Sequence, residues 1–226
     1  MPELSFLGLN LENLEVEIPL NTFSADKARF NRFEISGIKG SFDEEIKGSA
    51  VFLSYKGQGD IRYAAHDLFE DPSLSFDFKI EGLNLSDFVT SLSEDVYISG
   101  IMDVEGKGRL DKKGPAIEIT FRSKKERGVK QVMNFGAVKV ISSLGGGSPI
   151  KAIGSSNFAY SLIAGRATIK EGYLTIEGLA GERSGRQYLV RSGLWGGINL
   201  TIDRETNTIK IDELVRIIRK QVGAGF

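Results

Sequence analysis

The feature that most constrains this chain is a period-two alternation of apolar and polar residues, which returns in run after run. Residues 74–81, LSFDFKIE, show it most clearly, and residues 96–104 and 117–122 repeat it. Successive side chains of a strand point to opposite faces, so each run predicts a strand with one buried and one wet face. Turn signals such as Lys170-Glu171-Gly172 separate the runs. We therefore predict a mainly β, antiparallel sheet.

One face of these predicted strands carries Phe, Ile and Leu almost throughout, and this favours a curved or rolled sheet. In an open, taco-like sheet such residues would line a groove, whereas in a closed sheet they would fill each other. The alternation alone leaves both arrangements open. The candidate groove residues, each on the apolar phase of its own strand, are Phe76, Phe78, Ile80, Ile98, Met102, Ile117, Ile119 and Phe121.

A long amphipathic helix is predicted over residues 123–147. Apolar residues recur there with a period near 3.6 between Val129 and Leu144. Three consecutive glycines from position 145 and a proline at position 149 would end it. Two shorter helices are predicted at residues 87–92, capped by Ser86, and at residues 213–222, capped by Asp212.

The first part of the predicted long helix is basic, although a helix N-terminus favours negative charge. An anionic membrane would explain this arrangement, because each cation near such a surface gains about 1 kcal/mol. Two alternatives stay open: acidic residues of the first hundred neutralise the cations, or the helix only caps a β core. The candidate membrane-contact residues are Lys124, Lys125, Arg127, Lys130, Val132, Met133, Phe135 and Val140.

The charge of the chain is divided unevenly along its length. Residues 1–100 hold 8 Lys/Arg and 18 Asp/Glu, a net of −10, whereas residues 101–226 hold 21 and 12, a net of +9. The basic residues carry little aromatic interleaving, so we expect no nucleic-acid partner. No stretch is apolar for long enough to predict a membrane-spanning helix. We expect one domain over residues 1–226, a piece of a longer protein, with a candidate sub-boundary near 122–150.

Residues suited to catalysis are scarce. The chain has no cysteine and a single histidine, His66, which excludes thiol chemistry and a histidine-rich metal site. The carboxylates at 43–45 and 94–95 fit solvated turns better than acid–base chemistry. The glycines at 145–147 follow a predicted helix and lack the lysine of a phosphate-binding loop. We therefore expect no enzymatic activity, no metal and no cofactor.

Two segments carry a resemblance to a known family. Residues 78–110, FKIEGLNLSDFVTSLSEDVYISGIMDVEGKGRL, contain a strand, a Gly-Leu-Asn-Leu step, a short helix and an Ile-Ser-Gly strand. Residues 165–179, GRATIKEGYLTIEGL, contain a strand, a Lys-Glu-Gly turn and a second strand. These segments resemble the repeated unit and the C-terminal end of the AsmA-like superfamily of bacterial envelope proteins. The chain departs from full-length members in lacking an N-terminal membrane helix and a long repetitive body.

The resemblance implies a long β-groove that carries phospholipid between the inner and outer membranes. On that basis we expect a non-enzymatic, lipid-binding protein of the periplasm, associated with a membrane through the missing N-terminal part of its parent. Its implied partners are phospholipid or another acyl-chain lipid, a membrane surface and other envelope proteins. Two alternatives are a structural or scaffold domain with a self-filled core, and a carbohydrate-binding module built around Trp195.

Overall fold

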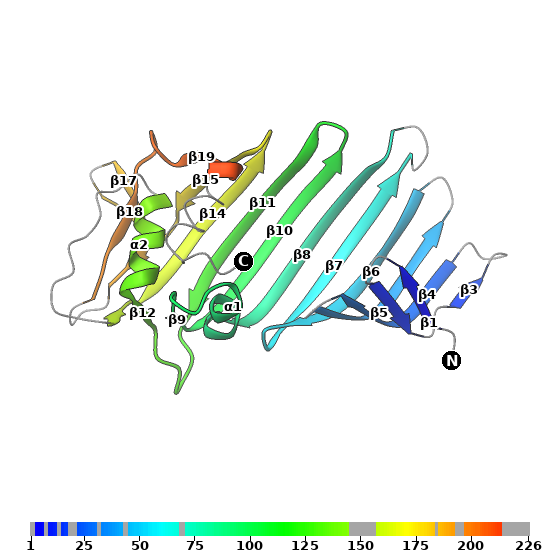
Figure 1. The fold of residues 1–226 in the computed structure, drawn as a ribbon, viewed down its shortest axis with the longest axis horizontal. Coiled ribbons are helices and arrows are strands. Elements are labelled where there is room, and N and C mark those ends of the chain that lie inside the picture. Colours follow the sequence, from blue (N-terminus) through cyan, green and yellow to red (C-terminus); the bar gives the residue numbers. More distant parts are fainter. Residues whose placement is uncertain are drawn as a thin grey trace.

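A computed structural model describes residues 3–6, 9–12, 15–17, 22–30, 33–42, 45–67, 71–144, 157–183, 185–192 and 197–213 of the 226-residue chain. Over these ranges the chain forms nineteen strands, two complete helices and a helical turn at residues 211–213, so the prediction of a mainly β, antiparallel protein is confirmed (Figure 1).

The strands as far as residue 111 are β1 (Glu3–Phe6), β2 (Leu9–Glu12), β3 (Glu15–Glu17), β4 (Thr22–Phe30), β5 (Phe33–Phe42), β6 (Glu45–Ser54), β7 (Gly57–His66), β8 (Ser73–Asn84), β9 (Ile98–Ser99) and β10 (Ile101–Asp111). The remaining strands are β11 (Gly114–Lys124), β12 (Val132–Asn134), β13 (Asn157–Ala159), β14 (Leu162–Lys170), β15 (Tyr173–Gly178), β16 (Glu182–Arg183), β17 (Arg186–Arg191), β18 (Leu200–Ile202) and β19 (Thr208–Lys210). The helices are α1 (Leu85–Leu92) and α2 (Phe135–Leu144).

Sixteen of these strands form one sheet, whose main path runs β1-β2-β4-β5-β6-β7-β8-β10-β11-β14-β15-β19. β3 pairs with β4, and β16, β17 and β18 join the path through the pairing of β17 with β14. β9, β12 and β13 form a second, three-stranded sheet. Between β11 and β14 the chain leaves the main sheet to form β12, α2 and β13, yet β11 and β14 pair directly. The main sheet therefore continues on both sides of segment 122–150.

The cross-strand register gives the main sheet one apolar and one polar face. A single row of paired positions, here called the long apolar row, crosses eleven strands and holds only apolar residues and glycine. Its members, in strand order, are Leu4, Leu11, Ala28, Ile35, Phe52, Gly59, Ile80, Val104, Phe121, Gly165 and Gly178. Neighbouring strands lie about 4.8 Å apart, so ten intervals give the row a length of about 48 Å.

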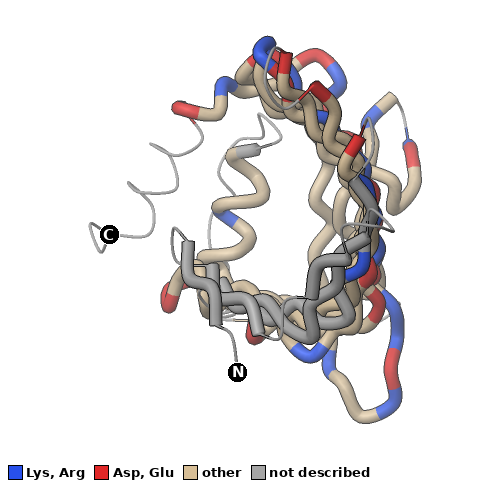
Figure 2. Tube along the Cα trace, turned by 90° about the vertical axis from the view of Figure 1, so that its right-hand side faces the viewer, with Lys and Arg blue, Asp and Glu red and all other residues tan. Residues whose placement is uncertain are grey.

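The main sheet bends around the side on which both helices lie. Figure 1 shows α1 and α2 in front of the sheet, and Figure 2, turned by 90°, shows the strands curving around a central space. Buried residues of the apolar face such as Met102 and Ile176 belong to the same cluster as Val138 of α2. The helices therefore lie on the apolar face, and the polar face is the convex one.

The buried core gathers near α2, β17 and β18 rather than along the whole apolar face. Met133, Ala137, Val138 and Val190 have no exposed surface, and Ile202 is 1% exposed. α2 supplies the middle of this cluster and contacts β18. One end of the apolar face is therefore filled by the protein's own side chains.

The long helix predicted at 123–147 is wrong in length, because among the described residues of this segment, 123–144, only Phe135–Leu144 is helical. Residues up to Lys124 continue β11, Gly128 has a φ of 85°, and residues 132–134 form β12. The helix begins after Asn134, whose side-chain Oδ1 accepts a hydrogen bond from the Ala137 N–H at 2.9 Å. An asparagine in this position satisfies a backbone donor of the first helical turn.

The first short helix exists, but its N-cap is Asn84 rather than Ser86. Asn84 Oδ1 accepts a hydrogen bond from the Asp87 N–H at 3.1 Å, and the helix runs from Leu85 to Leu92. Most of the final predicted helix, from residue 214 to 222, lies outside the described residues.

Candidate functional site

Seven of the eight predicted groove residues lie on the apolar face of the main sheet. Ile80 and Phe121 belong to the long apolar row. Phe78 and Ile119 both pair with Gly106, and Phe76 and Ile117 both pair with Gly108, which makes two further rows beside it. Met102 occupies the same face where β10 pairs with Leu83 of β8.

Ile98 is the exception among the predicted groove residues. It lies in β9, pairs with Met133 of β12 in the small sheet, and packs against the buried core. The alternation of apolar and polar residues over 96–104 predicted that Ile98 and Met102 share one face of a strand. The positive φ of Gly100, 146°, breaks that phase, because the chain passes there from one sheet to the other.

The seven residues divide into a covered and an uncovered group. Met102 is 7% exposed and belongs to the core, and Ile80 and Phe121 pack against it. The other four are half-buried and are neither in the core cluster nor packed against it. We call these four residues the open patch: Phe76, Phe78, Ile117 and Ile119.

The sequence analysis missed residues that extend the open patch over the neighbouring strands. Tyr63 pairs with Phe76, and Ile61 pairs with Phe78. On the other side Ile169 pairs with Ile117 and is likewise half-buried. The signal was present as alternation in residues 61–65 and 167–169, but these runs are short. Their register with β8 and β11 comes only from the paired sheet.

Aromatic rings on the apolar face lie over glycines of the adjacent strand. A Cβ atom placed on Gly106 would be 2.6 Å from Cε1 of Phe78, and one placed on Gly108 would be 2.6 Å from Cζ of Phe76. The two rings are stacked, with centroids 6.4 Å apart and an interplanar angle of 23°. The floor of the open patch is therefore made of flat rings over β10.

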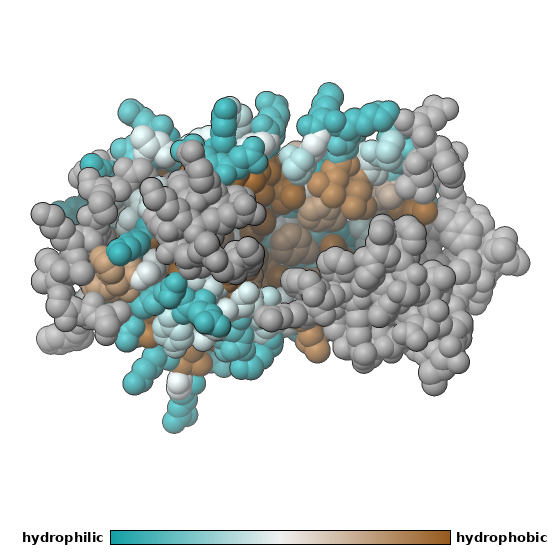
Figure 3. All heavy atoms as spheres, in the orientation of Figure 1, coloured by the Kyte–Doolittle hydropathy of each residue, from teal (hydrophilic) through white to brown (hydrophobic). Residues whose placement is uncertain are grey.

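The space-filling view shows that this face is hollowed. In Figure 3 hydrophobic residues line a depression in the middle of the molecule, and hydrophilic residues form its upper and lower rims. The rims are the strand ends and turns, where charged side chains such as Lys170 and Lys112 are exposed. An apolar floor with a charged rim is suited to an amphipathic ligand.

A cleft of about 1060 Å³ lies over this face, and its lining is mainly apolar. Six strands each supply three consecutive residues to its lining, such as Ser75, Phe76 and Asp77 of β8. Because side chains alternate, the middle residue of each set, such as Phe76 or Ile117, belongs to the apolar face, and its two neighbours point to the polar face. On the polar face, charged side chains pair across strands, as Arg62 does with Asp77 at 2.7 Å. Exposed pairs of this kind contribute little to stability.

The candidate membrane-contact residues do not share one helix or one surface. Met133 has no exposed surface and lies in the core, while Val132, Phe135 and Val140 are half-buried. Lys124 ends β11 and donates a hydrogen bond to Asp103 at 2.8 Å. The remaining three are exposed in the loop between β11 and β12, and are called the loop cations: Lys125, Arg127 and Lys130.

The loop cations form no ion pair with any residue that the structure describes. Among the same residues Glu126 is the one acidic side chain in the loop, and Val129 beside them is 36% exposed. The acidic residues of the first hundred that are described therefore do not neutralise this loop. It remains available to an anionic partner.

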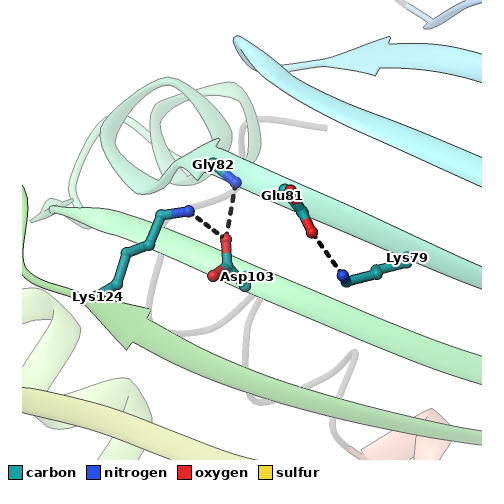
Figure 4. A network of polar contacts seen from close by, with 5 residues as sticks. All are labelled: Lys79, Glu81, Gly82, Asp103 and Lys124. Carbon is teal, nitrogen blue, oxygen red and sulfur yellow. Dashed lines mark hydrogen bonds and ion pairs between the residues drawn. The ribbon is translucent and has the colours of Figure 1, made fainter.

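Lys124 belongs instead to a structural contact at a bulge in β8. The pairing of β8 with β10 shifts between Met102 and Val104, and Gly82 has a φ of 76° there. The Gly82 N–H donates a hydrogen bond to Asp103 Oδ1 at 2.9 Å, beside the Lys124 contact (Figure 4). Burial raises the pKa of the Asp103 carboxyl, but these two donors outweigh it, and the net pKa is lowered. Asp103 therefore fixes the point where β8 turns into α1.

No catalytic arrangement emerges from the described residues. His66 ends β7, with Nδ1 3.2 Å from Oε2 of Glu45, and both side chains are accessible to solvent. Among the residues described, no group of three or more His, Cys, Asp or Glu could hold a metal ion. Within the same ranges no helix is long and apolar enough to cross a membrane. Asp43, Glu44 and Trp195 lie outside the described residues.

Comparison with known proteins finds no family model, no curated protein and no solved structure that matches this chain. The resemblance to the AsmA-like superfamily therefore stays a hypothesis, carried by the motifs in residues 78–110 and 165–179. The functional interpretation depends on the geometry of the apolar face.

Proposed function

We propose that the bent sheet is an open groove that holds the acyl chains of a lipid on its apolar face. The observation that carries this proposal is the open patch, whose four large apolar side chains are half-buried and outside the core. A protein interior normally covers such residues completely. The long apolar row, about 48 Å at 4.8 Å per strand, brings apolar residues and glycine into register across eleven strands.

The energetics favour an acyl chain as the occupant. Each methylene removed from water contributes about 0.8 kcal/mol, so a chain buried over ten carbons would gain several kcal/mol even after ordering costs. Charged groups at the rims, such as Lys112 and Lys170, can meet a headgroup while the chain lies on the floor. The chemistry fits a phospholipid better than a fully apolar molecule.

The resemblance to AsmA-like proteins extends this proposal from binding to transport. A groove without a catalytic group is suited to carrying phospholipid between the two membranes of a bacterial envelope. The protein would then act in the periplasm as part of a lipid path, without chemical conversion of its ligand. The loop cations would contact anionic headgroups of a membrane at one end of the path.

Site-specific photo-crosslinking tests the proposal directly. A photoreactive phenylalanine analogue replaces Ile117 or Ile119 on the apolar face, and Glu118 or Thr120 on the polar face serves as the matched control. After irradiation of the protein purified without detergent, mass spectrometry measures the lipid attached. We expect lipid adducts from the two apolar positions and none from their polar neighbours. Equal labelling of both faces, or no adduct at any position, contradicts the proposal.

A structural role in the envelope is the second candidate, and the filled core near α2 favours it. Met133, Val138 and Val190 are completely covered there by other side chains of the protein. If the same packing extended over the open patch, the sheet would need no ligand. The crosslinking experiment would then return only intramolecular products.

A further inference from the structure

The pairs of phenylalanine and glycine on the apolar face recur too regularly to be explained by turns or flexibility. Gly59, Gly106, Gly108 and Gly165 all lie inside strands, and none has a positive φ. Glycine in a strand interior costs stability, since it loses more backbone entropy than other residues and packs no side chain. Some compensating contact is therefore required at each position.

The contact is the same in all four cases. A Cβ on Gly59 would lie 2.4 Å from Cζ of Phe52, and one on Gly165 would lie 2.6 Å from Cζ of Phe121. Both pairs belong to the long apolar row, and the Gly106 and Gly108 pairs lie beside it on β10. Real Cβ atoms do not approach carbon atoms this closely, so any larger residue would push the ring away from the sheet.

A displaced ring has one direction in which to move. The strands lie beneath it and neighbouring side chains flank it, so it must rise into the space above the apolar face. For Gly106 and Gly108 that space is the open patch, because Phe76 and Phe78 are not packed against the core. The added Cβ itself cannot shift toward β11, since the Glu118 carbonyl oxygen would be 3.1 Å from a Cβ at position 106.

We infer that Gly106 and Gly108 set the depth of the groove, by letting Phe78 and Phe76 lie flat so that an acyl chain fits above them. This inference rests on the proposed lipid-binding function and adds the residues that decide whether a chain is accepted. Aromatic rings laid over glycine on a neighbouring strand also stabilise a sheet in general. The two roles differ in their consequence for ligand binding, which an experiment can separate.

The test compares Gly106→Ala/Gly108→Ala with the wild type in binding cis-parinaric acid, a fatty acid whose fluorescence rises in apolar surroundings. Raised rings would remove contact equivalent to about two methylenes, so we expect affinity to fall about tenfold or more. Lys107→Ala, between the two glycines but on the polar face, is the matched control and should bind as the wild type does. Thermal unfolding of each variant shows whether it remains folded.

A ring deletion provides the decisive comparison. In Gly106→Ala/Phe78→Leu the displaced ring is absent, so binding should recover relative to Gly106→Ala alone even if the sheet is less stable. Without ligand, the Hα resonances of Gly106 should show the upfield shift of a ring lying above them, and Phe78→Leu should abolish it.

The outcomes separate this inference from the function on which it rests. If the wild type binds cis-parinaric acid and the alanine substitutions leave its affinity unchanged, only the inference about groove depth is overturned. Failure of Phe78→Leu to restore binding overturns it as well, since the effect would then not act through the ring. Absence of binding by a folded wild type overturns the lipid-binding proposal and this inference together.

Discussion

Truncation of an apolar residue in the open patch should lower the free energy of unfolding less than truncation of one in the core. The difference between the two measures how open the groove is. Met133 has no exposed surface and lies within the core. Met133→Ala loses about three heavy atoms of buried side chain and leaves a cavity, so it should cost about 3 to 4 kcal/mol. Ile119 is half-buried and outside the core, so Ile119→Ala should cost only about 1 kcal/mol, with no enclosed cavity.

Urea unfolding followed by circular dichroism measures both costs in protein freed of lipid. With a slope of about 2 kcal/mol per M, the midpoint should fall by more than 1 M for Met133→Ala and by about 0.5 M for Ile119→Ala. A ligand that binds only the folded state then adds stability that depends on its concentration. Saturating cis-parinaric acid should therefore raise the wild-type midpoint more than that of Ile119→Ala.

The two substitutions refute the reasoning if they lower the midpoint equally in the absence of lipid. Ile119 would then lie in a filled interior, and the apolar face would be an ordinary core. A small effect of Met133→Ala would show instead that Met133 does not lie in a filled core. Either outcome would favour the structural role over lipid binding.

Three further predictions concern charge and hydrogen bonding. Substitution of all three loop cations by Gln should abolish flotation of the protein with phosphatidylglycerol vesicles at low salt. The control variant, with Gln at Arg62, Lys79 and Lys107, changes the net charge equally and should still float. Identical flotation of the two variants contradicts the membrane role of the loop. Asp103→Asn should lower stability at pH 7, and because the folded-state pKa of Asp103 is lowered, the difference from the wild type should shrink as the pH falls below about 4. Urea midpoints at pH 7 and pH 3 measure this, and a pH-independent difference would count against it. The buried Tyr160 hydroxyl donates a hydrogen bond to the Ser99 backbone carbonyl at 2.6 Å. Tyr160→Phe leaves this carbonyl without its partner, so it should lower the free energy of unfolding by about 1 to 3 kcal/mol, measured by thermal or urea unfolding. A neutral effect would mean that water replaces the bond.

Local alternation was sufficient to predict the faces of the long strands. Phe76, Phe78, Ile117 and Ile119 were placed correctly on one side because the period of two is fixed by the strand backbone itself. Their pairing through glycines of β10 was not predictable, since register depends on bulges such as the one at Gly82. The same limit applies to Tyr63 and Ile169, which join the patch only through pairing between strands.

The long helix was mispredicted because apolar residues can fit a period of 3.6 by chance over a short range. Val132 and Met133 fitted the helical stripe, yet they belong to β12, the central strand of the small sheet between β9 and β13. Gly128 and the cap at Asn134 were visible in the sequence, and both mark boundaries that the longer pattern concealed. Tertiary pairing decided the structure of this segment, and no local signal encodes a partner 35 residues away.

The size of the apolar face supplies a further argument that something besides the two helices must cover it. At 1.5 Å per residue, the ten residues of α2 span about 15 Å and the eight of α1 about 12 Å. Even placed end to end they would reach along little more than half of a row about 48 Å long. In the part of the chain that the structure describes, α2 is already used over the core, and the open patch lies beyond it. A face of this length would expose several large apolar side chains to water at about 25 cal/mol per Å² unless a ligand or another segment lay on it. If the flat Phe–Gly pairs set the depth of that space, as we infer, an acyl chain can lie there, in line with the lipid-binding function that we propose.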